Sequence, residues 1–404
     1  MAVEKTTPFD EGLLDEIVQE YGTPVFVYEE AGIRASAQRL NAAFSWSEDY
    51  VNHFAVKATP TPAIMRVLEE EGMGFDASSR LELRMLDNAQ LGENGIFYTS
   101  NNTPDRDYQY AHLLDATINV DKLPYIEQVR RALGDLPMRM VIRYNPGTEQ
   151  SNDLIGTKFG DTEDHVLEGL ALMKKGGVDL IGLHAMVVTN ETDPEAFGRT
   201  AQQLRVMAEK AMDLHGVEVE LINIGGGLGV NYRPDEEPVD VEAIGQAVEA
   251  ELGDTGIRVV SENGRHLTGP HGYLVSRVTH GMVEGHETLM TIDASVNSMP
   301  RLKAGGYHHI TFPGHETAGT REMTVVGSMC ANTDRMYKGW PVPDTLQPGD
   351  LAVMHDVGAH VRANAGNYNL KTIPGEVLVS PDGSHRMVQR HEEEEDLFAT
   401  ITEW

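Results

Sequence analysis

The stretch HFAVKAT, residues 53 to 59, decides the fold prediction because it places a lysine at the end of an apolar strand. Residues 53–56 form a short apolar run typical of a buried parallel strand, and Lys57 follows it directly. In a (β/α)8 barrel the carboxyl ends of the strands form the active face, where an amine with a lowered pKa can attack an aldehyde or ketone. A solvated lysine in a strand–helix loop is the alternative for this residue taken alone.

Strand-like and helix-like patterns alternate on both sides of Lys57 for about 230 residues, the usual length of a closed (β/α)8 barrel of the TIM type. An open doubly wound sheet is less well supported, because no early strand ends in a GxGxxG turn. We predict strands at residues 51–56, 74–77, 95–99, 117–120, 138–143, 180–187, 219–224 and 257–261. We predict helices at residues 29–43, 62–71, 79–89, 122–133, 162–175, 195–215 and 240–253.

After about residue 270 the pattern changes to short β-type runs separated by Gly, Pro, Asp and Asn. This change predicts a C-terminal domain of antiparallel strands, of the β-sandwich or β-barrel kind. We place the barrel at residues 28–270, and the second domain at residues 1–27 plus 271–404. The acidic run HEEEED, residues 391–396, is expected to be a solvated segment without chemistry.

Composition excludes several classes of function. The formal net charge of -31 and the pI near 4.8 argue against nucleic-acid and anionic-membrane partners. The chain lacks an apolar run long enough for a bilayer, its first residues lack a signal-peptide pattern, and it has one cysteine, Cys330, so we expect a cytoplasmic protein. Of 32 basic residues only 10 are lysine, which suggests a salt-adapted cytosol as a hypothesis.

The run INIGGGLG, residues 222–229, follows an apolar strand and contains four glycines. Glycine tolerates positive φ and a close approach of the backbone, so consecutive amides can point at an anion such as a phosphate. A tight turn also needs glycine and is the alternative. At the end of the eighth strand, SENGR, residues 261–265, places Glu262 and Arg265 at the barrel mouth, where they could pair or hold a ligand. His184, inside the sixth strand, is either a core histidine or a flat surface for an aromatic cofactor.

Together, a barrel-mouth lysine, a phosphate cradle, a stacking histidine and a carboxylate for a ring nitrogen describe a site for pyridoxal phosphate. A carboxylate beside the pyridine nitrogen keeps it protonated and makes the ring a strong electron sink. A decarboxylase gains more from a strong sink than a racemase does, so Glu262 favours loss of CO2.

These motifs, with CANTD at residues 330–334, resemble the fold-type III pyridoxal-phosphate decarboxylases, the group of diaminopimelate, ornithine and arginine decarboxylases. The resemblance covers nearly the whole chain in order and implies an alanine racemase-like barrel. It identifies Lys57 as the Schiff-base lysine, His184 as the stacking residue and Glu262 as the partner of the ring nitrogen. It also implies the following site residues: Gly225, Gly226 and Gly227 for the phosphate, Gly264 and Arg265 for phosphate or substrate, and Asp76, Arg143 and His360 beside the cofactor.

The same resemblance implies a homodimer with shared active sites. Cys330 would enter the partner's site and help to return a proton, although a small buried hydrophobic role is the alternative. Arg301 and Asp334 would contact the substrate, together with Arg265 and His360.

The sequence departs from the diaminopimelate decarboxylase pattern at several positions. Ala331 replaces a glutamate, Val187 a serine and His360 a tyrosine, and Met299 precedes the proline where that family has Arg-Pro. These changes weaken the case for a distal substrate carboxylate, which Arg301 or Lys303 could still hold.

The chain looks more like a divergent branch near the D-ornithine/D-lysine decarboxylases. We therefore expect decarboxylation of a diamino acid at a D-configured α-carbon. A diaminopimelate decarboxylase proper that makes L-lysine, a non-catalytic pyridoxal-phosphate carrier and an alanine-type racemase remain alternatives.

Overall fold

The computed structural model describes residues 5–147, 158–283 and 287–404. Two compact units make up the chain, and we call them the barrel unit and the β unit. The barrel unit comprises Arg34–Val230 and Val239–Leu267.

Eight strands of the barrel unit form a closed, all-parallel barrel, which confirms the predicted fold. The barrel is closed by β2 and β9, where Asn52 lies opposite Ser261. The sixth barrel strand, β7, ends at His184, earlier than predicted, and the apolar residues that follow it are buried without being in a strand. The strands are β2 (Val51–Ala55), β3 (Gly74–Ala77), β4 (Ile96–Ser100), β5 (Thr117–Val120), β6 (Arg139–Arg143), β7 (Leu180–His184), β8 (Leu221–Asn223) and β9 (Arg258–Ser261).

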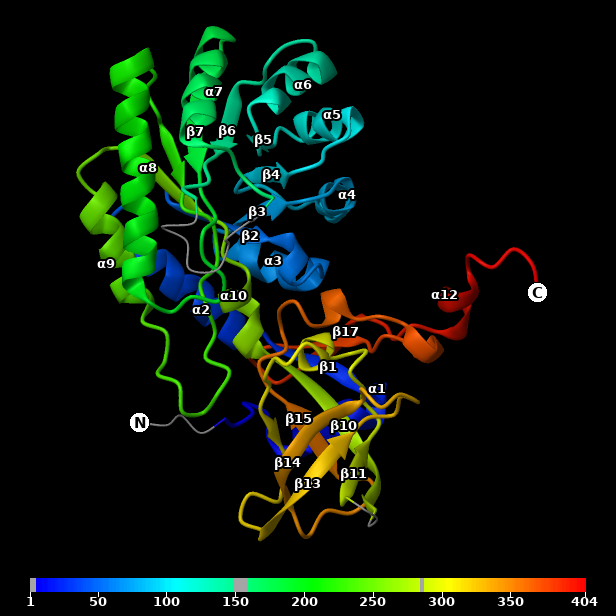
Figure 1. Cartoon of the computed structure of the whole chain (residues 1–404). Helices are drawn as coiled ribbons and strands as arrows, with labels where there is room; N and C mark the ends of the chain where they lie inside the picture. The colour runs from blue at the N-terminus through cyan, green and yellow to red at the C-terminus, as the bar shows by residue number, and fades with distance from the viewer. Residues whose placement is uncertain (1–4, 148–157, 284–286) are drawn as a thin grey trace. The chain divides into compact units, whose positions relative to one another are not determined.

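Helices surround this barrel on the outside (Figure 1). Their starts follow the sequence signals: the Ser79 hydroxyl accepts a hydrogen bond from the Glu82 amide, and the Asp240 carboxylate accepts one from the Ala243 amide. The helices are α2 (Glu30–Ala43), α3 (Pro62–Glu70), α4 (Arg80–Ala89), α5 (Asp105–Leu113), α6 (Pro124–Leu133), α7 (Glu163–Lys175), α8 (Pro194–His215) and α9 (Val241–Leu252).

Side chains that point into the barrel form layers, because successive residues of a strand alternate between its two faces. The apolar layer consists of Phe97, Val141, Leu221 and Val260, with Leu180 packed against it. Two residues further along the same four strands, toward the barrel mouth, lie Thr99, Arg143, Asn223 and Glu262. Strand alternation therefore places polar and charged side chains directly beyond an apolar floor.

The β unit comprises Met1–Ile33, Asn231–Pro238 and Thr268–Trp404 and contains a nine-stranded sheet. Two of its strand pairs are parallel, β1 with β16 and β11 with β13, so the predicted antiparallel domain is a mixed sheet. Parallel pairs join segments far apart in sequence, which local turn signals cannot reveal. The strands are β1 (Val25–Glu29), β10 (Gly272–Val283), β11 (Leu289–Ile292), β12 (Ile310–Thr311), β13 (Thr320–Val326), β14 (Arg335–Pro343), β15 (Leu351–Met354), β16 (Glu376–Val379) and β17 (His385–Gln389).

The core of the β unit forms between this sheet and the N-terminal helix α1 (Glu11–Tyr21). Leu14 and Ile17 of the helix pack with Val25 and Val27 of β1, which share one face of that strand. The remaining helices are short: α10 (Arg265–Thr268), α11 (Pro300–Lys303) and α12 (Glu394–Phe398). The acidic run at residues 391–396 overlaps α12, and the side chains of that helix are not buried.

Residues 231–238 belong to the β unit although barrel residues flank them on both sides. The Asn231 carbonyl oxygen accepts a hydrogen bond of 2.6 Å from Lys5 Nζ, and the Arg233 guanidinium lies 4.2 Å from the centre of the Tyr307 ring. The predicted division at residues 27/28 and 270/271 left residues 231–238 in the barrel, because this polar segment carries no local signal for a change of domain.

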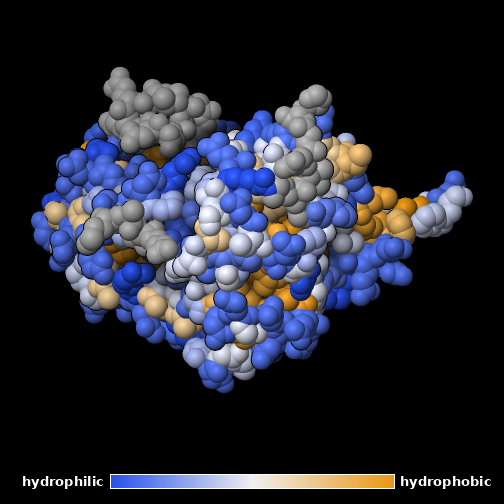
Figure 2. Space-filling view, turned by 90° about the horizontal axis from the view of Figure 1, so that it is seen from below, coloured by the Kyte–Doolittle hydropathy of each residue, from blue (hydrophilic) through white to orange (hydrophobic). Residues whose placement is uncertain are grey.

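Within the described residues, no helix is both long enough and apolar enough to cross a membrane. The face of the molecule in Figure 2 is mostly hydrophilic, with smaller hydrophobic areas between the polar side chains.

Candidate active site at the barrel mouth

Lys57 lies in a short 3-10 turn, η1 (Val56–Ala58), directly after β2. Its Nζ lies 3.6 Å from Oδ2 of Asp76, on β3, and donates a hydrogen bond of 3.3 Å to Ser78 Oγ. The structure therefore places the lysine at the carboxyl end of its strand, as the sequence indicates, and brings it beside the predicted residue Asp76.

The charges around Lys57 act against the lowered pKa that the sequence suggested. Desolvation lowers the pKa of Lys57, but the carboxylates of Asp76 and Glu262 outweigh it and leave the pKa above its ordinary value. Asp76 is fully buried, and neither carboxylate oxygen has a hydrogen-bond partner. Burial and then repulsion from Glu262 raise the pKa of Asp76 to about 7.

Glu262 is held by two polar side chains of the barrel interior. Its Oε1 accepts hydrogen bonds from Asn223 Nδ2 at 2.7 Å and from the Thr99 hydroxyl at 3.5 Å. Burial raises the pKa of Glu262, while Lys57 and the hydrogen bond from Asn223 act in the opposite direction. The carboxylate thus has a fixed position in a poorly solvated site.

His184 ends β7 with only 1% of its surface exposed. Burial, and then the cations of Arg143 and Lys57, hold the pKa of His184 well below its ordinary value, so the ring is neutral. Asn119 Nδ2 lies 2.8 Å from His184 Nδ1 and donates a further hydrogen bond of 3.2 Å to Thr99 Oγ1. With Nδ1 as acceptor, the proton lies on Nε2, which is 3.6 Å from Oε2 of Glu262.

Sequence reasoning missed Asn119, Thr99 and Asn223, which connect His184 to Glu262. A signal for them existed, since each is a polar residue at an inward position near the carboxyl end of an otherwise apolar strand. The individual residues are too common for this signal to stand out before the strands are aligned.

The three glycines after β8 form a tight turn against neighbouring backbone. Gly225 and Gly227 have φ of 72° and 98°, and a Cβ on Gly226 would lie 2.4 Å from the Glu262 carbonyl oxygen. The Gly226 amide meets only the Met186 sulfur, at 3.2 Å, and the Gly227 amide has no acceptor among the described residues. Both amides are therefore available to an anion.

Gly264 and Arg143 complete the mouth. A Cβ on Gly264 would lie 2.8 Å from the Cβ of Ala58, so glycine lets the last loop pack against the turn that carries Lys57. Arg143 is buried, with Nη1 3.8 Å from Asp121 Oδ1, and desolvation lowers its pKa. Arg265 is half-buried at the start of α10.

Four predicted site residues lie in the β unit. Cys330 is exposed, so it is not the small buried hydrophobe of the alternative interpretation. Asp334 is buried, and its carboxylate accepts hydrogen bonds from the amides of Val296 at 2.8 Å and Met329 at 2.7 Å. These bonds fix the Asp334 carboxylate in its loop, and its contact with substrate stays a prediction. The Arg301 guanidinium lies 3.6 Å from the centre of the Tyr232 ring, and His360 has a φ of 58°.

Comparison with known proteins agrees with this geometry. Residues 30–269 match the family described as "Pyridoxal-dependent decarboxylase, pyridoxal binding domain". Protein TabA of Pseudomonas amygdali pv. tabaci is 34% identical over 96% of this chain and 93% of its own. Diaminopimelate decarboxylase of Methanothermobacter thermautotrophicus is 31% identical over 95% and 92%. The crystal structure of diaminopimelate decarboxylase from M. jannaschii superposes with a TM-score of 0.89 at 23% identity, over 96% of this chain and 94% of the other.

Proposed function

The chain belongs to the pyridoxal-dependent decarboxylases, and we propose that it removes CO2 from a diamino acid at a D-configured α-carbon. It is an amino-acid decarboxylase of the diaminopimelate decarboxylase family with pyridoxal phosphate as its cofactor. The observation that best supports the site assignment is the position of Lys57 Nζ, 3.6 Å from Asp76 at the mouth of a barrel that also buries Glu262.

The residues at the mouth fit pyridoxal phosphate group by group. The amides of Gly226 and Gly227 lack strong acceptors and suit a phosphate. The neutral His184 ring offers a flat, uncharged face, and the fixed Glu262 carboxylate suits a protonated ring nitrogen. Lys57, the lysine of this site, would hold the aldehyde carbon.

When bound, the cofactor supplies an electron-withdrawing ring that accepts the electron pair left by the departing carboxyl group. Glu262 would keep the proton on the ring nitrogen, because Asn223 and Thr99 hold its carboxylate in one position. After the substrate amine displaces it, Lys57 Nζ would deliver one proton to the α-carbon in place of the lost carboxyl group, and Asp76 and Glu262 favour the protonated form of that amine. His184, oriented by Asn119, would cover one face of the site and exclude water.

The substrate is proposed from the departures in the β unit. The stacking of Arg301 on Tyr232 supports Arg301 as an anchored cation that could hold a substrate carboxylate. A free diamine end would need no such partner, which leaves D-lysine and D-ornithine beside meso-diaminopimelate.

The decisive experiment measures CO2 release from meso-diaminopimelate, D-lysine, D-ornithine and L-arginine side by side. Release from a D-configured substrate and none from L-arginine is the expected result. An Arg301→Gln variant that loses meso-diaminopimelate turnover but keeps D-lysine turnover would identify the distal carboxylate site. Racemisation without gas release, or cofactor binding without turnover of any amino acid, would contradict the proposal.

We also propose that the enzyme works as a homodimer to which Cys330 contributes across the interface. The exposed position of Cys330 in its own subunit supports this arrangement. Mixing inactive Lys57→Ala and weakly active Cys330→Ala proteins should restore part of the activity, because hybrid dimers contain one site with both residues intact. No gain over the sum of the separate proteins, or an active monomer in sedimentation, would refute it.

Adaptation to high salt is a further part of the proposal. The charge of -31 produces self-repulsion that salt screens, with a Debye length of about 10 Å at 0.1 M and about 3 Å at 1 M. We expect the melting temperature and activity to rise between these salt concentrations. Full stability and activity at the lower concentration would argue against salt adaptation.

A further inference from the structure

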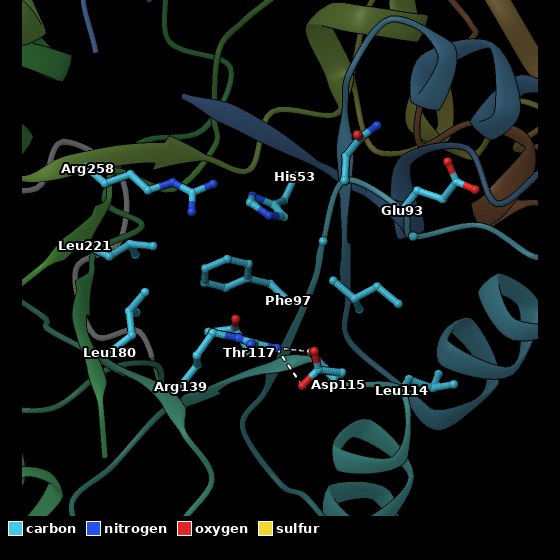
Figure 3. A pocket seen from close by; sticks show the side chains of 14 residues that line it. His53, Glu93, Phe97, Leu114, Asp115, Thr117, Arg139, Leu180, Leu221 and Arg258 are labelled. Carbon is cyan, nitrogen blue, oxygen red and sulfur yellow. Dashed lines mark hydrogen bonds and ion pairs between the residues drawn. The ribbon is translucent and has the colours of Figure 1, made fainter. Parts of the chain in front are cut away.

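The end of the barrel opposite the mouth contains a cavity of about 400 Å³ (Figure 3). Its walls come from the amino-terminal ends of the barrel strands, and they include His53, Phe97, Leu180, Leu221 and Arg258. The volume lies in the lower part of the range of small-molecule sites. The apolar layer of the barrel separates this cavity from the mouth, since Phe97 and Leu221 belong to both the layer and the cavity wall.

His53 is the buried polar group of this cavity. It is 3% exposed, and its Nδ1 has no hydrogen-bond partner. The ring packs edge-on against Phe97, with 4.4 Å between ring centres. Burial and then the charge of Arg258 lower the pKa of His53 to about 3, so the imidazole is neutral and has one N–H to donate. Nδ1 is closed off from solvent, whereas Nε2 lies beside Gly95 at the cavity wall, so Nε2 is the nitrogen that can donate to a ligand there.

The two arginines of the cavity differ in what they bind. Arg139 pairs with Asp115 through an ion pair of 2.7 Å and also donates to the Asp115 carbonyl oxygen. Arg258 donates from Nε to the Asp49 carbonyl oxygen at 2.9 Å and forms no ion pair within the described residues. In Figure 3 its guanidinium extends into the cavity toward His53, whereas the carboxylate of Glu93 points away from it.

The remaining wall is apolar and open. Phe97, Leu180 and Leu221 face the space below Arg258 (Figure 3). Gly95 lies beside His53, where a Cβ would be only 3.3 Å from Nε2, so glycine at this position keeps the space next to the imidazole free. The cavity therefore combines one cationic fork, one neutral N–H donor and a hydrophobic wall.

We propose that this cavity binds a small organic carboxylate, with its carboxylate on Arg258 and His53 and its hydrocarbon part against Phe97, Leu180 and Leu221. The forked guanidinium matches the two oxygens of a carboxylate. The apolar wall and the volume suit a ligand with several carbon atoms better than a halide or inorganic phosphate. This site is independent of the cofactor and of the decarboxylation chemistry.

Isothermal titration calorimetry of the cofactor-loaded full-length protein tests the proposal with acetate, hexanoate, inorganic phosphate and chloride as probes. We expect hexanoate to bind most tightly. Replacement of a charge-assisted hydrogen-bond donor should weaken hexanoate binding by about tenfold or more in Arg258→Gln. His53→Phe should weaken it less, because it removes one neutral N–H donor and keeps a ring against Phe97. Arg106→Gln, on the exposed surface of α5, is the matched control and should bind normally.

Two variants distinguish this cavity from the active site. Lys57→Ala and Glu262→Gln should bind hexanoate as the unchanged protein does, since both residues lie beyond the apolar layer. Binding that these two changes abolish and Arg258→Gln leaves intact would place the ligand at the mouth and overturn the proposal. Equal binding of acetate and hexanoate, preference for phosphate, or no binding of any probe would overturn it as well.

Discussion

The mouth and the base of the barrel are built from the same eight strands, yet their polar side chains differ in which charged groups surround them. At the mouth, Asp76 and Glu262 are buried near each other and near Lys57, and burial, followed by repulsion from Glu262, raises the pKa of Asp76 to about 7. At the base, Arg139 is neutralised by Asp115, whereas His53 and Arg258 form no ion pair within the described residues. The mouth contains buried like charges with shifted pKa values, which is typical of catalytic sites, whereas the base resembles a binding pocket.

The largest expected effect is the loss of CO2 release when a residue at the mouth is replaced. Lys57→Ala should reduce CO2 release by about 10⁴-fold or more, because it removes both the amine that holds the cofactor and a proton carrier. Steady-state kinetics and the visible absorbance of bound cofactor provide the measurements. Lys338→Ala, an exposed lysine of the β unit, is the control. Turnover near that of the unchanged enzyme would remove Lys57 from the mechanism.

Glu262→Gln should lower kcat by about 10²- to 10³-fold, since an amide cannot keep the ring nitrogen protonated. The hydrogen bond from Asn223 has an acceptor in either case, so the fold should persist. Thr99→Val removes the longer bond of 3.5 Å to Glu262 and the acceptor for Asn119, but it leaves the carboxylate and its bond from Asn223 in place, so its effect should be smaller. An equal loss of kcat in both variants would mean that Glu262 contributes through packing and not through its charge.

Asp76 should make stability depend on pH. Its pKa rises from an ordinary 3.8 to about 7 on folding, so the folded state binds the proton more strongly. The free energy of unfolding should therefore fall as pH rises from about 4 to about 7, because the unfolded state releases this proton at lower pH than the folded state does. Between about pH 5 and pH 8, Asp76→Asn should become relatively more stable by about 2 kcal/mol in urea unfolding. A difference that does not change with pH would contradict the raised pKa.

The smallest effect concerns the apolar layer between the two ends. Val141→Ala removes two buried methyl groups and should lower the free energy of unfolding by about 1 to 2 kcal/mol. Turnover per folded molecule should stay near that of the unchanged enzyme, because the Val141 side chain lies in the apolar layer and forms no hydrogen bond to a residue of the active site. A kinetic loss as large as that of Glu262→Gln would show that the floor positions the site.

Much of the barrel could be predicted from local patterns. Alternating apolar runs and helical segments indicated all eight barrel strands, and Lys57, the lysine at the mouth, lies in the turn directly after the first of them. The four glycines after β8 indicated a tight turn, which the positive φ of Gly225 and Gly227 requires. These features depend on neighbours a few residues away, which is the range that a sequence pattern reports.

The hydrogen bonds of Asp334 lie beyond the range of such reasoning. Its carboxylate accepts a hydrogen bond from the amide of Val296, 38 residues away in the chain. The parallel pairing of β1 with β16 likewise joins residues about 350 positions apart. Long-range pairs of this kind carry no local periodicity, so only the folded chain reveals them.

By itself, the sequence determined the order of the barrel strands, the cofactor class and the lysine at the end of the first strand, because strand periodicity and glycine turns are local properties. Only the tertiary structure decided which side chains meet across the barrel. It placed two carboxylates beside Lys57 and so raised a pKa that was expected to fall. It also buried His53, one residue of an apolar run, at the opposite end with no hydrogen-bond partner for its Nδ1. Charge and burial act through distances in space, and those distances exist only once the strands have closed.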